Sequence, residues 1–189
     1  MSETMTQVRT NLYIGGEERT TAEELPVPDP GKAGRIVGVA ASASPQDVSD
    51  AVAAAKAAYP AWSALTPQQR AEQMNAALAG IEEHRDDDAA ILSQENGKIR
   101  MEAWVDSLVF EIRWKLATAL ADEIDQAKVL SPAPGIPVET TITYKSLGVV
   151  SIIVPFNWPI AILGAALPHA LIAGNAVIVK PPPSTPSDL

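Results

Sequence analysis

The stretch that decides the fold is VVSIIVPFNWPIAILGAALPHALIAGNAVIVK, residues 149–180. It opens with a mainly apolar, β-branched run, residues 149–154, which is typical of a strand buried on both faces of a parallel sheet. A turn bounded by prolines follows, and residues 160–173 are apolar enough for a covered helix. Residues 176–179 form a second apolar run, so the stretch predicts a βαβ unit and an α/β protein.

This topology places two polar residues together. Because the strands of a βαβ unit are parallel, the turn that carries Asn157 and the strand end at Lys180 meet at one edge of the sheet, where open α/β sheets bind ligands. An amide near a helix N-terminus beside an ammonium suits an oxyanion, or phosphate and ribose oxygens. Taken singly, Asn157 also fits an ordinary turn or N-cap, and Lys180 a solvated strand end.

Other candidate sites are weaker. The turn lacks the G-x-G-x-x-G pattern of a dinucleotide loop, and Gly15 and Gly16 fit a hairpin turn better than a phosphate loop. His169 falls in the middle of the predicted helix with no evident carboxylate partner, which favours a packed or solvent-facing histidine over a catalytic one.

Upstream of residue 126 the sequence predicts short hairpins and then four helices. Ser44 and Thr66 are N-caps followed by proline, a third helix is expected from about Asp86 to a left-handed cap at Gly97, and the fourth ends near Asp125. The apolar stripes expected to face the core are Val48, Val52, Ala55, Tyr59 and Trp62; Ala71, Met74, Leu78 and Ile81; and Met101, Val105, Leu108, Ile112 and Leu116. Trp104 and Trp114 are expected to pack in the core or an interface.

The segment SPAPGIP breaks the helical pattern, and VETTITYKSL then alternates apolar and polar residues. Residues 138–146 therefore predict a half-exposed strand that pairs at a sheet edge or with another subunit.

The composition restricts the class of protein. Of 189 residues, 47% are hydrophobic and 20% charged, and the net charge of -9 disfavours nucleic acid and anionic membranes as partners. The absence of cysteine excludes disulfides, thiolate metal sites and a thiol nucleophile on this chain. With no signal-like N-terminus and no long apolar span, we expect a cytoplasmic protein.

The motifs go beyond these general inferences. PFNWP, with Lys180 23 positions after Asn157 and LPHALIAGNAVIVKPPPSTP around it, closely resembles the aldehyde dehydrogenase pattern P-W-N-F-P followed by P-A-L-A-x-G-N-x-V-V-x-K-P-x-E-x-T-P. YIGGEE, DPGKAGRIVGVAASASPQDVSDAVAAAKAAYPAWSALTPQQRAE and ENGK are similar to that superfamily's N-terminal strands and first helices, in the same order. The resemblance covers the chain from about residue 12 to 189.

The resemblance implies an incomplete Rossmann-like cofactor-binding domain, built from residues 1–125 and 147–189. Residues 126–146 would be a strand segment of the oligomerisation element, and the catalytic domain would be absent. The implied fold has N-terminal hairpins, a helical stretch and a terminal βαβ unit, and the whole protein is implied to be a homo-oligomer.

The implied reaction oxidises an aldehyde to a carboxylic acid, with hydride transfer to NAD or NADP, through a cysteine thiohemiacetal. By resemblance, Asn157 is the catalytic asparagine whose amide stabilises the oxyanion, and Lys180 binds the adenosine ribose. The nicotinamide would lie along residues 153–156. The implied cofactor-binding residues are Ile153, Val154, Pro155, Phe156, Lys180, Pro182 and Pro183; no metal site is implied.

Three departures from the family pattern matter. Phe156 and Trp158 exchange the usual aromatic order. Pro183 stands where the family often has a glutamate that would repel a 2′-phosphate, which tilts the expectation toward tolerance of NADP. The family's cysteine and general-base glutamate would lie beyond Leu189, and TPSD, residues 185–188, starts a helix with one residue left.

We therefore expect the N-terminal part of an aldehyde dehydrogenase, inactive as this chain alone. The alternative is a non-catalytic truncated module that binds nucleotide weakly or associates with full-length subunits through residues 138–146. The gene sequence beyond the codon for Leu189 distinguishes the two.

Overall fold

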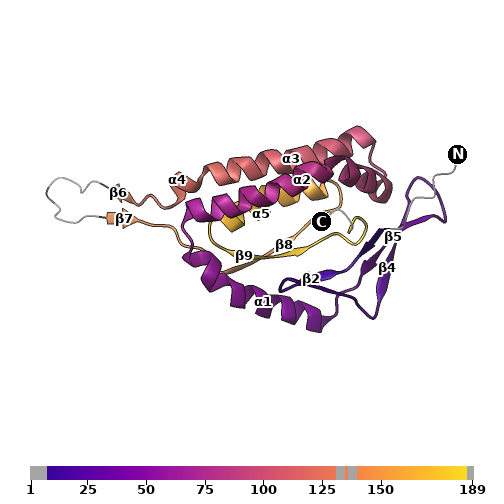
Figure 1. Ribbon diagram of the computed structural model, residues 1–189, viewed down its shortest axis with the longest axis horizontal. Helices are drawn as coiled ribbons and strands as arrows, with labels where there is room; N and C mark the ends of the chain where they lie inside the picture. Colours follow the sequence, from indigo (N-terminus) through magenta and orange to yellow (C-terminus); the bar gives the residue numbers. More distant parts are fainter. Residues whose placement is uncertain (1–7, 131–134, 136–139, 187–189) are drawn as a thin grey trace.

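The centre of the molecule is a βαβ unit. This computed structural model describes residues 8–130, 135 and 140–186. Strands β8 (Val149–Ile153) and β9 (Ala176–Lys180) are parallel and are joined by helix α5 (Pro159–Ile172). Helix α5 packs on one face of the strands and α1 (Pro45–Ala64) contacts them from the other side (Figure 1). The predicted α/β class and the βαβ unit are confirmed.

Two further helices pack against α5, and a short third helix packs against those two. They are α2 (Pro67–Asn96), α3 (Arg100–Ala119) and the short α4 (Ala121–Ile124). Helix α3 packs against both α2 and α5, and the main hydrophobic core lies between these helices and β8. The core includes Met74, Leu78, Leu92, Phe110, Trp114, Ile152, Val154, Ile160, Leu163 and Ile172.

The helix starts and one helix end follow the sequence signals. Ser44 and Thr66 each accept a hydrogen bond from the backbone N–H three residues on, and Asp47 and Gln69 return a bond to the cap backbone. These are capping boxes, and they confirm the N-caps that the sequence predicts at Ser44 and Thr66. Gly97 ends α2 with φ of 77°, the left-handed conformation that favours glycine.

The N-terminal strands form two small sheets. The strands are β1 (Val8–Thr10), β2 (Leu12–Ile14), β3 (Glu17–Arg19), β4 (Glu24–Pro28) and β5 (Ile36–Ala41). Strand β5 pairs in parallel with β1 and antiparallel with β4, and β2 and β3 form a hairpin whose turn is Gly15–Gly16, as predicted. The parallel β1 pairing was not predicted.

A two-stranded ribbon projects from one end of the molecule (Figure 1). It pairs β6 (Lys128–Leu130) antiparallel with β7 (Thr140–Ile142). The predicted strand over residues 138–146 is therefore confirmed only at residues 140–142, because residues 143–146 belong to no strand and positions 138 and 139 lie outside the described residues. Both strands are exposed, so the expected half-burial is wrong. Among the described residues, no helix is long and apolar enough to cross a lipid bilayer.

One predicted helix boundary is wrong. The sequence suggested a break before Asp86, but α2 is continuous over 30 residues. The acids at positions 86–88 therefore lie within the helix and do not start it. Arg85 instead pairs with Glu111 of α3 through two hydrogen bonds and lies 5.3 Å from the centroid of the Trp104 ring. The Arg85 side chain thus holds α2 against α3.

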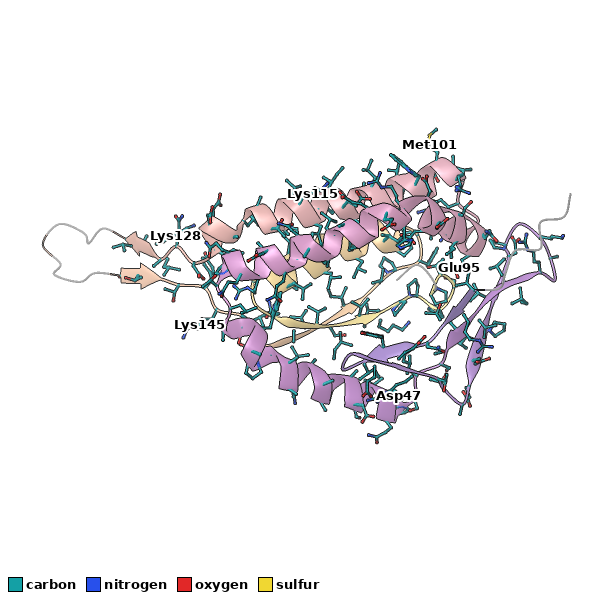
Figure 2. All side chains as sticks on the ribbon, in the orientation of Figure 1. Asp47, Glu95, Met101, Lys115, Lys128 and Lys145 are labelled. Atoms are coloured by element: carbon teal, nitrogen blue, oxygen red, sulfur yellow. The ribbon has the colours of Figure 1, made fainter. Side chains whose placement is uncertain are left out.

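The predicted inner face of α3 is also wrong. Met101, Ile112 and Leu116 are 73%, 48% and 60% exposed, and Figure 2 shows Met101 projecting from the end of the helix. Hydrophobicity indicates the wrong face because the packed face carries two carboxylates that are neutralised by partners from outside α3. The buried residues of α3 are Ala103, Asp106, Ser107, Phe110, Glu111, Trp114, Ala117 and Thr118.

Strand β8 is buried on one face only. Ile152 and Val154 lie in the core beside α5, whereas Ser151 is exposed and Ile153 is 74% exposed. The expectation of burial on both faces is wrong. Likewise, no residue of α1 is fully buried, and Val48 is 55% exposed, although the other residues of its predicted stripe are partly buried.

Candidate functional site

The edge of the sheet at the carboxyl ends of β8 and β9 carries the predicted polar residues. Ile153 lies opposite Lys180 in the parallel register, and the Val154 N–H donates to the Lys180 carbonyl at 3.1 Å. The turn after β8 leads to Asn157, two residues before α5 begins at Pro159. The chain thus brings Asn157 and Lys180 to one edge, as the topology predicts.

Asn157 is exposed, and within the described part of the chain its side-chain amide has no hydrogen-bond partner. Phe156 before it is 65% exposed, and Trp158 after it is partly buried. The amide N–H groups are therefore available to an external acceptor such as an anionic oxygen.

The residues on both sides of Asn157 are held by the segment that follows α2. Asn96 Nδ2 donates to the Phe156 carbonyl at 2.6 Å, and Lys98 Nζ lies 3.9 Å from the centroid of the Trp158 ring. The second contact has the geometry of a cation–π interaction. Two residues of the ENGK segment thus contact the turn immediately before and after Asn157.

The first turn of α5 is capped from another helix. Trp158 provides no side-chain cap, and Asp106 Oδ1 of α3 accepts a hydrogen bond from the Ala161 N–H at 2.5 Å. A carboxylate at this place is favoured by the partial positive charge of the helix N-terminus. Arg113 of α3 donates to the Ala161 carbonyl, so α3 contacts both the backbone N–H and the backbone carbonyl of Ala161.

Asp106 and Lys98 form a buried ion pair. Their side chains are 0% and 5% exposed, and Lys98 Nζ lies 2.6 Å from Asp106 Oδ2. Burying either charge alone would be costly, and each side chain here neutralises the other while making a second contact, to Ala161 or to Trp158.

The opposite end of α5 is held by other buried groups. Arg70 donates from Nε to the Ile172 carbonyl at 2.9 Å and from Nη1 to the Leu65 carbonyl, and burial lowers its pKa. Asn175 Oδ1 accepts from the N–H groups of Leu147 and Gly148 at 2.6 and 3.1 Å. These bonds fix the start of β8 relative to the start of β9.

The remaining predicted site residues lie around the same edge with different accessibility. Pro155, Lys180 and Pro183 are exposed, whereas the side chains of Val154 and Pro182 are buried. Val154 and Pro182 therefore offer a ligand almost no accessible surface, and their contact with a cofactor stays a prediction.

Two further features lie outside this edge. A hollow of about 840 Å³ lies at the C-terminal end of α5, lined in part by Leu120, Ile124, Tyr144, Leu147 and Asn175. His169 is exposed, so of the packed and solvent-facing alternatives expected for it, the structure shows the solvent-facing one. In the described ranges, no three histidine or carboxylate side chains gather as potential metal ligands.

Sequence reasoning missed Asn96, Lys98 and Asp106 as parts of this site. ENGK carries only a resemblance in the sequence, and Asp106 and Glu111 are two acids on the face of α3 that packs in the core. An acidic residue on a helix face beside Phe110 and Trp114 was the available signal, because buried acids are rare unless they are paired.

Comparison with known proteins identifies the family. The family model described as "Aldehyde dehydrogenase family" matches residues 17–188. The 1-pyrroline-5-carboxylate dehydrogenase of Bacillus cytotoxicus is 31% identical over 186 residues, which cover 93% of this chain and 34% of that protein. The chain therefore spans about a third of the length of this relative.

Solved structures agree. The NAD-dependent aldehyde dehydrogenase of Sinorhizobium meliloti has a TM-score of 0.89 and 27% identity, covering 97% of this chain and 37% of that one. An NADP-dependent enzyme of Escherichia coli has a TM-score of 0.88 and 26% identity, covering 96% of this chain and 37% of that one.

Proposed function

The chain belongs to the aldehyde dehydrogenase family, and we propose that it is the N-terminal part of an NAD(P)-dependent enzyme that oxidises an aldehyde to a carboxylic acid. The observation that carries the proposal is the exposed, unpartnered amide of Asn157 on the same sheet edge as Lys180. In the proposed reaction, a cysteine outside these 189 residues attacks the aldehyde carbon, and the carbonyl oxygen becomes negatively charged.

Asn157 would stabilise that oxygen. Its side-chain N–H groups point to no acceptor in the described chain, so donating to the oxyanion breaks no existing hydrogen bond. A donor held in place before the reaction contributes most where the charge develops, and losing one such donor typically lowers kcat by about 10²- to 10³-fold.

The same edge fits a nicotinamide dinucleotide. Ile153 and Phe156 expose apolar surface beside Asn157, and Lys180 exposes an ammonium that can donate to ribose or phosphate oxygens. When bound, the cofactor supplies the acceptor for the hydride that leaves the aldehyde carbon. The chain's residues would bind and orient it beside Asn157.

We propose that NADP is tolerated as well as NAD. Pro183 is exposed and carries no carboxylate that would repel a 2′-phosphate. Similar structures with either cofactor dependence are known: one is described as NAD-dependent and another as NADP-dependent.

The 189-residue chain alone is expected to be inactive, because it contains no cysteine. Purified chain should give no reduction of NAD+ or NADP+ with an aldehyde, and 1-pyrroline-5-carboxylate is the first substrate to test, given the relative's name. Calorimetric titration should show only weak binding of either cofactor, since we expect the 189 residues to form only one side of the cofactor-binding crevice. Turnover, or micromolar affinity for NADP+, would contradict this proposal.

The second candidate is a non-catalytic module that associates with full-length subunits. The ribbon favours it, because Val129, Leu130 and Ile142 are 60%, 49% and 38% exposed. The DNA that follows the codon for Leu189 decides between the two. An in-frame continuation with a cysteine and a glutamate in family context supports the enzyme, and a stop codon followed by a new gene supports the module.

A further inference from the structure

We propose that Asn96, Lys98 and Asp106 are positioning residues that hold the backbone around Asn157 in the orientation the oxyanion requires. The inference rests on the proposed function for the role of Asn157. The contacts themselves are independent of it, and they involve none of the residues assigned to substrate or cofactor except through the turn.

The turn needs such contacts. Pro155 and Pro159 each fix their own φ angle, but the backbone between them, residues 156–158, contains no proline. The Trp158 carbonyl caps α5 by accepting from the Ile162 N–H at 3.0 Å, whereas Phe156 and Asn157 lie outside any helix or strand. Because the Asn157 side chain makes no hydrogen bond to any residue that the structure describes, the direction of its amide depends on the backbone on either side.

Each side of Asn157 has its own contact. The Phe156 carbonyl accepts from Asn96 Nδ2, and the Trp158 ring lies against Lys98 Nζ. Asn96 and Lys98 flank Gly97, whose φ of 77° reverses the chain at the end of α2. An ideal Cβ on Gly97 would lie 2.9 Å from Pro30 Cγ, so this reversal is itself closely packed.

Asp106 links the turn to the helix that follows it. Its Oδ2 holds Lys98 in place under Trp158, and its Oδ1 accepts from the third residue of α5. One buried carboxylate therefore sets the position of the Lys98 cation and of the first turn of α5 together. A displaced turn would misplace Asn157 relative to the developing charge, and a shift of about 1 Å can lower a rate by 10²-fold.

The test compares backbone amide order parameters of the 189-residue chain by NMR relaxation, at Asn157 and Trp158. The main variant is the double replacement Lys98→Met with Asp106→Asn, which removes the cation from Trp158 without leaving a lone buried charge and keeps an acceptor for Ala161. The wild type should show rigid values of about 0.85 at both positions, and the variant values below about 0.6. Lys98→Arg, which keeps the charge and can stack on the ring, should restore most of the order.

Two further variants keep the proposal falsifiable. Asn96→Ala removes only the bond to the Phe156 carbonyl and should lower the order parameter of Asn157 even if the double variant fails to fold. The matched control is Lys115→Met, which removes an exposed α2–α3 ion pair with Glu82 and should leave the turn rigid. If Asn96→Ala and the folded double variant both keep wild-type order at the turn while the melting temperature falls, these residues are merely structural and the proposal is wrong.

In the longer protein, kcat at an unchanged KM for the cofactor distinguishes a positioning role from a purely structural one. There the same variants should lower kcat on the order of ten- to a hundred-fold, with the KM for the cofactor unchanged. A rigid turn in the wild type that loosens in the variants, together with an Asn157→Ala enzyme of undiminished kcat, would leave the positioning contacts standing and remove the proposed role of Asn157. The two failures are therefore distinguishable.

Discussion

Asn157 is the residue on which the proposed chemistry depends, and its surroundings explain how an exposed side chain can still be oriented. The neighbouring carbonyl and ring are held by Asn96 and Lys98, so the backbone is fixed while the amide stays open to solvent. A partner bound to the amide itself would have to be displaced by substrate. Holding the backbone avoids that cost.

Asp88 of α2 gives a test of residue-level electrostatics. Burial raises the pKa of its carboxyl, so the folded state binds the proton more tightly than the unfolded state. Its contribution to the free energy of unfolding therefore falls as pH rises from the ordinary pKa through the raised one, and the full penalty is present at neutral pH. Asp88→Asn should stabilise the chain at pH 7 in chemical denaturation.

The advantage of Asp88→Asn should shrink as the pH is lowered toward the ordinary aspartate range, where the carboxyl is protonated in both states. The neighbouring Asp87 is exposed, and Asp87→Asn is the matched control with a much smaller effect. An Asp88→Asn advantage that is constant across this pH range would contradict the assignment.

Part of the site followed from the sequence. Asn157 and Lys180 could be placed together because a βαβ unit fixes which strand ends share an edge. Asn96 and Asp106 could not be placed, because they contact residues 60 and 55 positions away, Phe156 and Ala161, across helix packing that no local pattern encodes.

At the scale of elements, the close approach of α3 and α5 decides which face of α3 is buried. An ideal Cβ on Gly164 would lie 2.8 Å from the Cα of Phe110, so this glycine lets the two backbones meet. The contact turns the Asp106 face of α3 inward, and the more apolar stripe that begins at Met101 lies outside.

Gly164→Ala should therefore destabilise the chain. The added methyl group meets backbone, which cannot move without shifting a helix, and overpacking of this kind typically costs about 1–3 kcal/mol. Gly80→Ala of α2 is the matched control, because its Cβ would meet nothing within 4 Å and alanine favours a helix over glycine by about 1 kcal/mol. Denaturant unfolding that ranks Gly164→Ala as stable as Gly80→Ala would contradict the packing.

Helix ends that depend on local signals could be predicted, whereas features that depend on contacts between elements could not. The caps at Ser44, Thr66 and Gly97 are local signals, and each was predicted and confirmed. The continuity of α2 and the inner face of α3 depend on partners from other elements, such as Glu111 for Arg85, and both were predicted wrongly.

At the scale of the whole molecule, the exposed apolar surface predicts association. Leu147, Ile153 and Phe156 are 89%, 74% and 65% exposed, and β8 and β9 form a sheet that has two strands in the part of the chain the structure describes. Apolar surface and open strand edges favour contacts between chains. Sedimentation velocity of the purified chain should show discrete oligomers, and a monodisperse monomer would contradict this expectation.

The central claim is that Asn157 stabilises the oxyanion of an aldehyde dehydrogenase. The most direct test is kcat for aldehyde oxidation by the longer protein of which we propose this chain to be part, compared with its Asn157→Ala variant. The account predicts a loss of kcat of about 10²- to 10³-fold, with the melting temperature and the KM for the cofactor unchanged. An Asn157→Ala enzyme with the kcat of the wild type would contradict it.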